Sequence, residues 1–193
     1  DPCAWGYIIE NDGVNLTRIG IYTYTPAELS AYNNYFAQGG NLFLTALSNS
    51  SIDQNSANQL FSLFNITLNN DHVPVITIII NGEVSTDLIT GMHQHFITRW
   101  IDSFDYNGCS LNYTGDVYEL AWTRVMVLDA NGTSYPVNKT VMVALENGDG
   151  GRLVAAGSNF FLDNWALLNQ YRSSQNWNLV VQTTFWLLDI LTD

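Results

Sequence analysis

The pattern of apolar and polar residues predicts a strand, a helix and a second strand within the first fifty residues. Residues 19–24 are rich in β-branched and aromatic side chains, which is typical of a strand. Residues 25–28, Thr-Pro-Ala-Glu, form a capping box with proline at the first helical position, and they predict a helix to about Gln38. Gly39 and Gly40 end this helix, and residues 41–47 indicate a buried strand. Such a βαβ unit has parallel strands.

The remaining chain predicts more strands than helices. We expect a helix over residues 56–64, strands over 73–80, 95–104, 118–128, 140–145 and 152–156, a short segment near 161–170 and a final helix over 176–191. The final helix is nearly all apolar, so it should be buried against the sheet. No repeat, low-complexity tract or linker interrupts this pattern, which indicates a single α/β domain over residues 1–193.

Charge excludes some classes of partner. The chain of 193 residues carries six Lys and Arg against 18 Asp and Glu, a formal net charge of −12. Nucleic acids and anionic membrane surfaces require a basic face, so neither is expected as a partner. No apolar run reaches the roughly 18 residues of a membrane span.

Asparagine supplies much of the polar surface that charge does not. The chain has 22 Asn, and six of them begin an N-x-[ST] sequon: Asn15, Asn49, Asn65, Asn112, Asn131 and Asn138. We expect N-linked glycans at these sites, because sugars solubilise a surface without charge.

The two cysteines indicate an oxidising compartment. Cys3 and Cys109 both lie beside turn-forming residues. A disulfide between them would tie segment 1–18 to the core over 19–193 and stabilise the fold by about 4–5 kcal/mol. The alternative is two unrelated thiols. With the sequons and a chain that begins without Met, the disulfide predicts an extracellular or cell-surface location. Few Lys and many Asn, Tyr, Ile and Thr are typical of extracellular proteins of thermoacidophilic archaea.

The histidines offer a candidate metal site. His93 and His95 would share one face of an extended segment, with His72 or Asp102 as a third ligand. The alternative is a pair of solvated histidines at the start of a strand. We expect no metal and no cofactor.

Acidic and hydroxyl side chains offer candidate hydrolytic groups. Asp102 with Asp105, or Asp149 with Asp163, could act as an acid and base pair as in glycosidases. Ser158 follows a predicted strand, where doubly wound folds bind ligands, but no G-x-S-x-G elbow surrounds it. Residues 129–132 faintly resemble a calcium loop and are better interpreted as a hairpin turn.

The tryptophans leave two interpretations open. Most have apolar neighbours in the sequence, which favours core packing, although Trp is also enriched at protein interfaces. The residues concerned are Trp100, Trp122, Trp165, Trp177 and Trp186.

Two stretches together resemble a known family. Residues 24–44 (Tyr-Thr-Pro-Ala-Glu-Leu to Gly-Gly-Asn-Leu-Phe-Leu) and 151–191 (Gly-Arg-Leu-Val-Ala-Ala-Gly-Ser-Asn-Phe to Trp-Leu-Leu-Asp-Ile-Leu) are similar to the second half of class I glutamine-amidotransferase-like domains. Residues 88–92 and 108–111 resemble a non-catalytic version that follows the protease domain of some subtilisin-like enzymes, including site-one protease. The resemblance implies a flavodoxin-like, three-layer α/β fold with a partly parallel sheet and an antiparallel hairpin extension.

The chain also departs from that family. Catalytic members carry a nucleophilic Cys on a strand-to-helix elbow, but no helical pattern follows Cys109, and no His follows His95. Ser158 and Asn159 stand where the family has Asp. The family's first strands are missing, so the sheet should be incomplete at its N-terminal side.

These observations predict a non-enzymatic extracellular glycoprotein domain with a structural or protein-interaction role, as an accessory module or processed piece of a larger surface protein. A protein partner, or copies of the chain itself, would complete the sheet. The alternatives are a self-assembling subunit of an extracellular filament or surface layer, and a secreted hydrolase whose carboxylates are not located.

Overall fold

The computed structural model describes residues 23–46, 54–73, 79–80, 83–84, 87–168 and 173–190. The helices are α1 (Pro26–Ala37), α2 (Gln54–Phe61), α3 (Asn164–Leu167) and α4 (Asn176–Leu187), with 3-10 helices η1 (Ser62–Phe64) and η2 (Phe160–Leu162). The strands are β1 (Leu42–Thr45), β2 (Ile66–Leu68), β3 (Ile79–Ile80), β4 (Glu83–Val84), β5 (Asp87–Ile89), β6 (Gly91–Met92), β7 (Phe104–Tyr106), β8 (Leu111–Tyr113), β9 (Tyr118–Leu128), β10 (Ser134–Glu146) and β11 (Arg152–Ala156).

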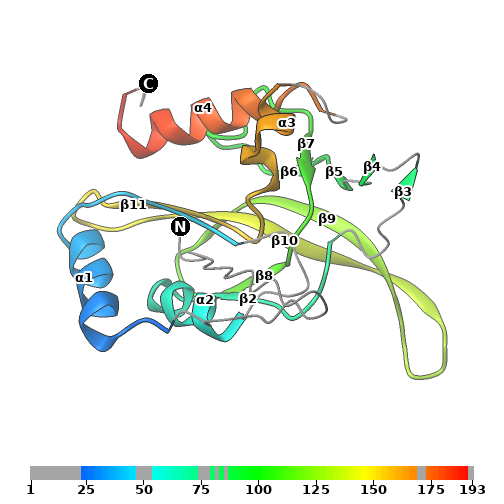
Figure 1. Ribbon diagram of the computed structural model, residues 1–193, viewed down its shortest axis with the longest axis horizontal. Helices are drawn as coiled ribbons and strands as arrows, with labels where there is room; N and C mark the ends of the chain where they lie inside the picture. The colour runs from blue at the N-terminus through cyan, green and yellow to red at the C-terminus, as the bar shows by residue number, and fades with distance from the viewer. Residues whose placement is uncertain are drawn as a thin grey trace, which may run out of the picture.

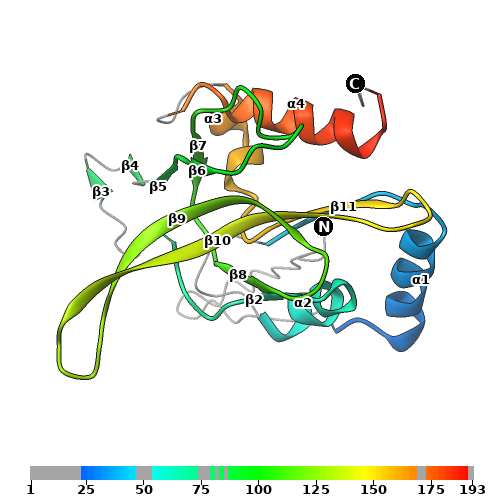
Figure 2. The ribbon, with the colours of Figure 1, turned by 180° about the vertical axis from the view of Figure 1, so that it is seen from behind.

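A curled mixed sheet is the centre of the fold (Figure 1). Its order is β1-β11-β10-β8-β2, with β9 paired along the other edge of β10 and β6 paired to β9. Strand β1 runs parallel to β11, and the remaining pairings in the described part of the chain are antiparallel. The long strands β9 and β10 form a ribbon that extends well past the other strands (Figure 2).

The predicted flavodoxin-like, three-layer α/β fold is therefore wrong. The molecule is mostly β, with a half-barrel sheet and few helices. Alternating apolar residues show that a segment is a strand but do not specify its direction, because both directions bury alternate side chains. The predicted parallel partner of β1 is residues 19–24, of which 19–22 lie outside the described residues and 23–24 form no strand.

Several local predictions are confirmed. In the capping box of α1, the Glu28 amide donates to Thr25 Oγ1 at 3.3 Å and the Thr25 amide donates to Glu28 Oε2 at 2.8 Å. Strands β9 and β11 have the predicted bounds. Strand β10, however, begins at Ser134 inside the predicted loop, and residues 96–100 form turns where a strand was expected.

The sheet has a separate core on each face. Helix α4 lies over one face and α1 with α2 over the other (Figure 1). Leu179 and Leu187 of α4 pack on the first side with Met142, and Phe36 and Phe61 pack on the second. No helix in the described residues is long and apolar enough to span a membrane.

A buried carboxylate joins α4 to β7. Asp105 is fully buried, and its Oδ2 accepts from the Ser173 amide at 2.8 Å and from Asn176 Nδ2 at 2.9 Å. The Asp105 amide donates back to Asn176 Oδ1 at 2.8 Å. Asn176 is the first residue of α4 and is also fully buried. This side-chain network sets where α4 begins, since no side chain caps its first turn.

Replacing Asp105 with Asn tests this junction. Asn has the same shape as Asp but no charge, and its NH2 group can face the Ser173 and Asn176 donors where Asp presents an acceptor. We therefore expect Asp105→Asn to lower the free energy of unfolding by about 3 kcal/mol. The measurement is urea unfolding, with Asp116→Asn at an exposed bend as the matched control, expected to change stability by less than about 0.5 kcal/mol. Equal effects for the two variants would contradict the assignment.

Candidate interaction surface

The turn over residues 93–103 is fixed by buried residues on its inner side. Thr98 Oγ1 donates to the His93 carbonyl at 2.5 Å and accepts from the His95 amide at 3.1 Å. Ile97 and Ile101 are buried in the core beneath α4. The His93 carbonyl and the His95 amide bond to the Thr98 side chain and are not available to a neighbouring strand, so the segment forms turns instead of the predicted strand.

Trp100 is presented in an unusual way. It is 78% exposed and has a φ of 65°, in the left-handed region that bulky side chains avoid. Gln175, just before α4, fixes this geometry: its Oε1 accepts from the amides of Asp102 at 2.6 Å and Ser103 at 3.0 Å, and its Nε2 donates to the Trp100 carbonyl at 3.4 Å. A left-handed non-glycine residue costs about 1–2 kcal/mol, so the fold stabilises a strained, solvent-facing Trp.

Arg99 is held between two aromatic rings. Its guanidinium carbon lies 4.0 Å from the ring centroid of Phe96 and 4.6 Å from that of Trp100. Its buried Nε has no hydrogen-bond partner, and within the described part of the chain no carboxylate forms an ion pair with it. The two rings thus fix the position of the Arg99 guanidinium, while its Nε donor stays without a hydrogen-bond partner.

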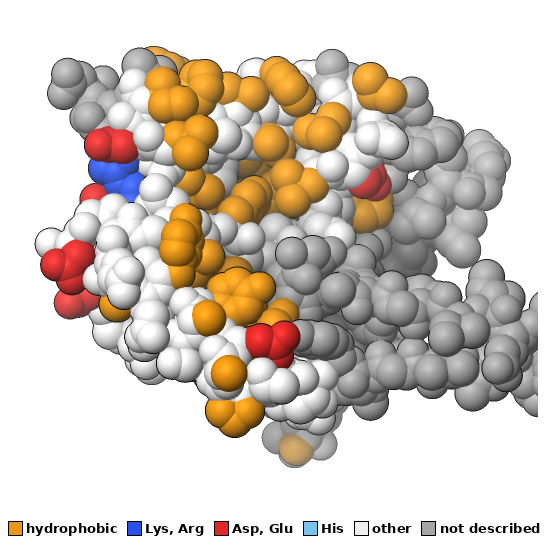
Figure 3. All heavy atoms as spheres, turned by 60° about the vertical axis from the view of Figure 1, so that its left-hand side comes forward, with side chains coloured by type: hydrophobic (Ala, Val, Ile, Leu, Met, Phe, Trp, Pro, Cys, Tyr) orange, Lys and Arg blue, Asp and Glu red, His pale blue; other side chains and the backbone are white. Residues whose placement is uncertain are grey.

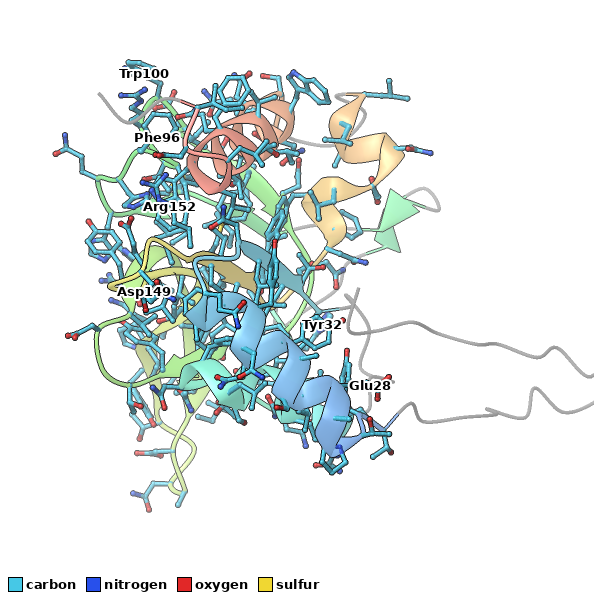
Figure 4. The ribbon with its side chains drawn as sticks, turned by 90° about the vertical axis from the view of Figure 1, so that its left-hand side faces the viewer. Glu28, Tyr32, Phe96, Trp100, Asp149 and Arg152 are labelled. Atoms are coloured by element: carbon cyan, nitrogen blue, oxygen red, sulfur yellow. The ribbon has the colours of Figure 1, made fainter. Side chains whose placement is uncertain are left out.

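Helix α4 also exposes apolar side chains. It contains no charged residue, and its buried side includes Leu179, Thr183 and Trp186. Its outward side exposes Trp177, and Leu188 and Ile190 follow it, also exposed. Figure 3 shows hydrophobic side chains gathered on one face of the molecule, and Figure 4 shows Phe96 and Trp100 beside α4. We name Phe96, Arg99 and Trp100 the Trp100 surface.

A second stack closes the other end of the turn. The His95 ring lies 5.3 Å from the rings of both Tyr118 and Trp186. Arg152 lies 5.3 Å from the Trp186 ring and donates to Asp189 Oδ1 at 2.7 Å and Glu146 Oε1 at 3.1 Å. Burial lowers the pKa of His95 from its ordinary value of 6.5; Glu146 opposes this shift and Arg152 adds to it. The imidazole is therefore neutral at pH 7.

A shallow hollow of about 340 Å³ lies between α1 and β1, with Glu28 and Tyr32 on its wall (Figure 4). Tyr24, Tyr35 and Leu42 also line it. The Glu28 carboxylate accepts from the Thr25 amide and hydroxyl in the capping box, so it serves the helix start. This hollow presents aromatic rings rather than a set of converging reactive groups.

The candidate metal ligands are not brought together. His93 Nε2 lies 2.9 Å from Glu119 Oε1, whereas His95 is enclosed by rings. Asp102 accepts from Gln175 Nε2 at 3.4 Å. Among the described residues, no three His, Cys, Asp or Glu side chains are placed to hold a metal ion.

The candidate hydrolytic groups have structural roles. Asp105 anchors α4, and Asp163 caps α3 by accepting from the Ala166 amide at 2.7 Å. Ser158 is buried and donates to the Asn107 carbonyl at 2.6 Å, so the expectation of a ligand site there is not supported. Residues 129–133 form the predicted hairpin turn, with Asp129 Oδ1 accepting from two backbone amides of the turn.

The predicted Cys3–Cys109 disulfide is not tested by the described residues. Cys109 is buried, and no disulfide occurs within the part of the chain that the structure describes. Its predicted partner Cys3, with segment 1–18, lies outside the described residues. The sequon residues Asn65, Asn112, Asn131 and Asn138 are exposed, and Asn15 and Asn49 also lie outside. Glycosylation stays a prediction.

The tryptophans divide between the two interpretations. Trp186 is buried in the core, whereas Trp100 and Trp177 are exposed. Sequence reasoning missed Arg99, Phe96 and Gln175 altogether. The adjacency of Arg99 and Trp100 was a usable signal, because these two residue types are enriched at interface hot spots.

Comparison with solved structures finds a shared fold. The structure described as "mmIFT52 N-terminal domain" superposes with a TM-score of 0.64 over 86% of this chain and 72% of that chain, at 21% sequence identity. No protein family model and no curated protein sequence matches the chain. At this identity the likeness shows the fold alone.

This comparison argues against two predictions. The similar structure is a domain of IFT52, not the amidotransferase-like or site-one-protease-like domain that the sequence resembled. The likeness to a domain of IFT52 also gives no support to the predicted extracellular, cell-surface location. The resemblance failed because its motifs are short helix and strand ends that unrelated folds share.

Trp100→Asn tests whether Trp100 serves the fold or a partner. Asn tolerates left-handed backbone, so relief of strain should exceed the lost Arg99 stacking and raise the free energy of unfolding by about 0.5–1 kcal/mol. Trp177→Asn, also exposed but in helical conformation, is the matched control and should be neutral or slightly destabilising. Denaturant unfolding gives both values. A loss of stability in Trp100→Asn would show that Trp100 holds the fold together.

The His95 stack predicts a pH dependence. Because burial lowers the folded-state pKa of His95 below 6.5, the unfolded chain binds the proton first as the pH falls. The stabilisation is thus present above pH 6.5 and is lost as the pH falls from 6.5 through the folded-state pKa. His95→Gln removes this component, so urea unfolding between about pH 7.5 and 5.5 should show a smaller loss for the variant. Equal losses would mean that the carboxylates alone set the slope.

Proposed function

We propose that this chain is a non-catalytic protein-interaction domain that binds a partner protein through the Trp100 surface. The observation that carries the proposal is Trp100 itself: a strained, highly exposed tryptophan whose backbone Gln175 clamps. Backbone strain persists where the surroundings enforce it, and it gathers at sites of function.

The composition of the surface fits a protein partner. Trp and Arg dominate interface hot spots, and both occur here side by side with their geometry already fixed. A fixed side chain loses less entropy on binding, which raises affinity. Helix α4 supplies an uncharged flank on a protein of net charge −12, and charge is depleted at the centre of protein interfaces.

The structural roles of the candidate reactive groups support the non-enzymatic part of the proposal. Ser158, Asp105 and Asp163 each hold backbone amides or carbonyls in place. The likeness to a domain of IFT52, an intraflagellar transport protein, agrees with a role inside a protein assembly but does not name a partner for this chain.

Site-specific photo-crosslinking tests the proposal in cells that produce the protein. A photoreactive phenylalanine at Phe96 or Trp100 should crosslink one common protein, and the same probe at Ser30 or Tyr35, both exposed on α1, should not. The partner is then purified, and its affinity for the chain is measured directly.

The affinity measurement decides the outcome. Trp100→Ala should weaken binding by about 2 kcal/mol or more, roughly 30-fold, and Arg99→Ala by a similar amount. Tyr35→Ala, at an exposed side chain on α1 away from the surface, should leave the affinity unchanged. Crosslinks that are no stronger at the Trp100 surface than at the control positions, or binding that is indifferent to Trp100, would refute the proposal.

A further inference from the structure

The outer part of the β9–β10 ribbon stands apart from the rest of the sheet. We name residues 124–139 the arm. Among the described residues, they pair only with each other along their backbones, from Arg124 opposite Asn138 to Leu128 opposite Ser134. Figures 1 and 2 show the arm projecting away from the body. Its tip is held by Asp129, whose Oδ1 accepts from the amides of Asn131 and Thr133 at 2.8 Å each.

The two edges of the arm differ. On the β10 side, Pro136 lacks an amide hydrogen and Lys139 is ion-paired to Asp71 at 3.0 Å, and both features discourage the addition of another strand. On the β9 side, strand β6 covers Ala121 and Trp122, but no described strand pairs with residues 124–128. That edge contains neither proline nor an acidic residue.

The side chains of the arm are more apolar than an isolated ribbon requires. Met126 is 55% exposed and Leu128 is 72% exposed, and Tyr135 is also exposed. Two-stranded ribbons are marginally stable in water, and three or more strands are usually needed. The arm therefore has the character of an incomplete sheet with one open edge.

The sequence of the β9 edge is complementary to itself. If two copies pair antiparallel about a twofold axis at Met126, Arg124 of one copy lies opposite Leu128 of the other, and Val125 lies opposite Val127. No like charges meet in this register. The arm carries Arg124 and Lys139 against Asp129, a net charge of +1 within a chain of −12, so the negative charge that would keep two such molecules apart is absent from the arm.

We propose that the chain forms a twofold-symmetric dimer in which the β9 edges of two arms join into a continuous four-stranded sheet, β10-β9-β9-β10. The occupant of the open edge is a second copy of this chain, in the Met126-centred register. This interface is separate from the Trp100 surface, so either proposal can fail without the other.

Sedimentation velocity of the full chain, together with a charge exchange at Met126, tests the dimer. The unsubstituted protein should dimerise at concentrations up to about 1 mM. Met126→Lys and Met126→Glu each place like charges opposite one another at the axis, and each should weaken the dimer by at least about tenfold. An equimolar mixture of these two variants should recover the dimer as a heterodimer. Ser134→Lys, on the β10 strand of the same arm, should leave dimerisation unchanged.

Three results would overturn the proposal. They are a monomeric protein over the whole concentration range, a dimer that tolerates lysine at position 126, and a lysine effect that mixing with the Met126→Glu variant does not reverse. All the substituted side chains are exposed, so the variants should retain the unfolding midpoint of the parent, which denaturant unfolding checks.

Discussion

The buried carboxylate of Asp105 is the interaction on which the arrangement of this protein depends. A charged group without solvent is costly unless its oxygens are satisfied, and here the Ser173 amide and the Asn176 side chain satisfy Oδ2. That requirement fixes the first turn of α4 against β7. Because α4 covers one entire core, a shift at this junction would disturb the packing of Leu179 and Leu187 as well.

The same junction connects stability to the exposed surface. Gln175 precedes Asn176 directly, so the network that fixes α4 also fixes the side chain that clamps Trp100. The strain at Trp100 is therefore offset by the hydrogen bonds of Gln175 and by the buried Asp105–Asn176 network that holds Gln175 in place. The exposed residue, Trp100, is thus distinct from the residues that hold its backbone. Its side chain can therefore be replaced without loss of the fold.

The sequence predicted local structure better than tertiary structure. The capping box of α1, the bounds of β9 and β11 and the final helix all depend on neighbours a few residues apart, and each was visible in the sequence. Strand direction, the curl of the sheet and the turn at 96–100 depend on contacts across the chain. Thr98, for example, makes a turn by bonding to His93 and His95, and the pattern of apolar residues in this segment does not predict these bonds.

The candidate site shows the same division. The sequence placed Trp100 among five tryptophans without separating exposed from buried ones, because exposure depends on what α4 covers. The sequence singled out Ser158 and the aspartates as candidate reactive groups. In the folded chain, however, their side-chain oxygens form hydrogen bonds with backbone groups. Reactive residue types are common in structural roles, and spacing alone cannot distinguish the two uses.

The asymmetry of the arm limits how any strand-mediated assembly of this chain can grow. A ribbon with two open edges can add copies without end and produce fibres, whereas proline on one side leaves a single usable edge. Once that edge is occupied, the composite sheet ends on both sides in the proline-bearing strand β10. Pro136 therefore makes the stoichiometry self-limiting, and it acts as a safeguard against amyloid-like stacking in a protein that otherwise exposes apolar strand residues.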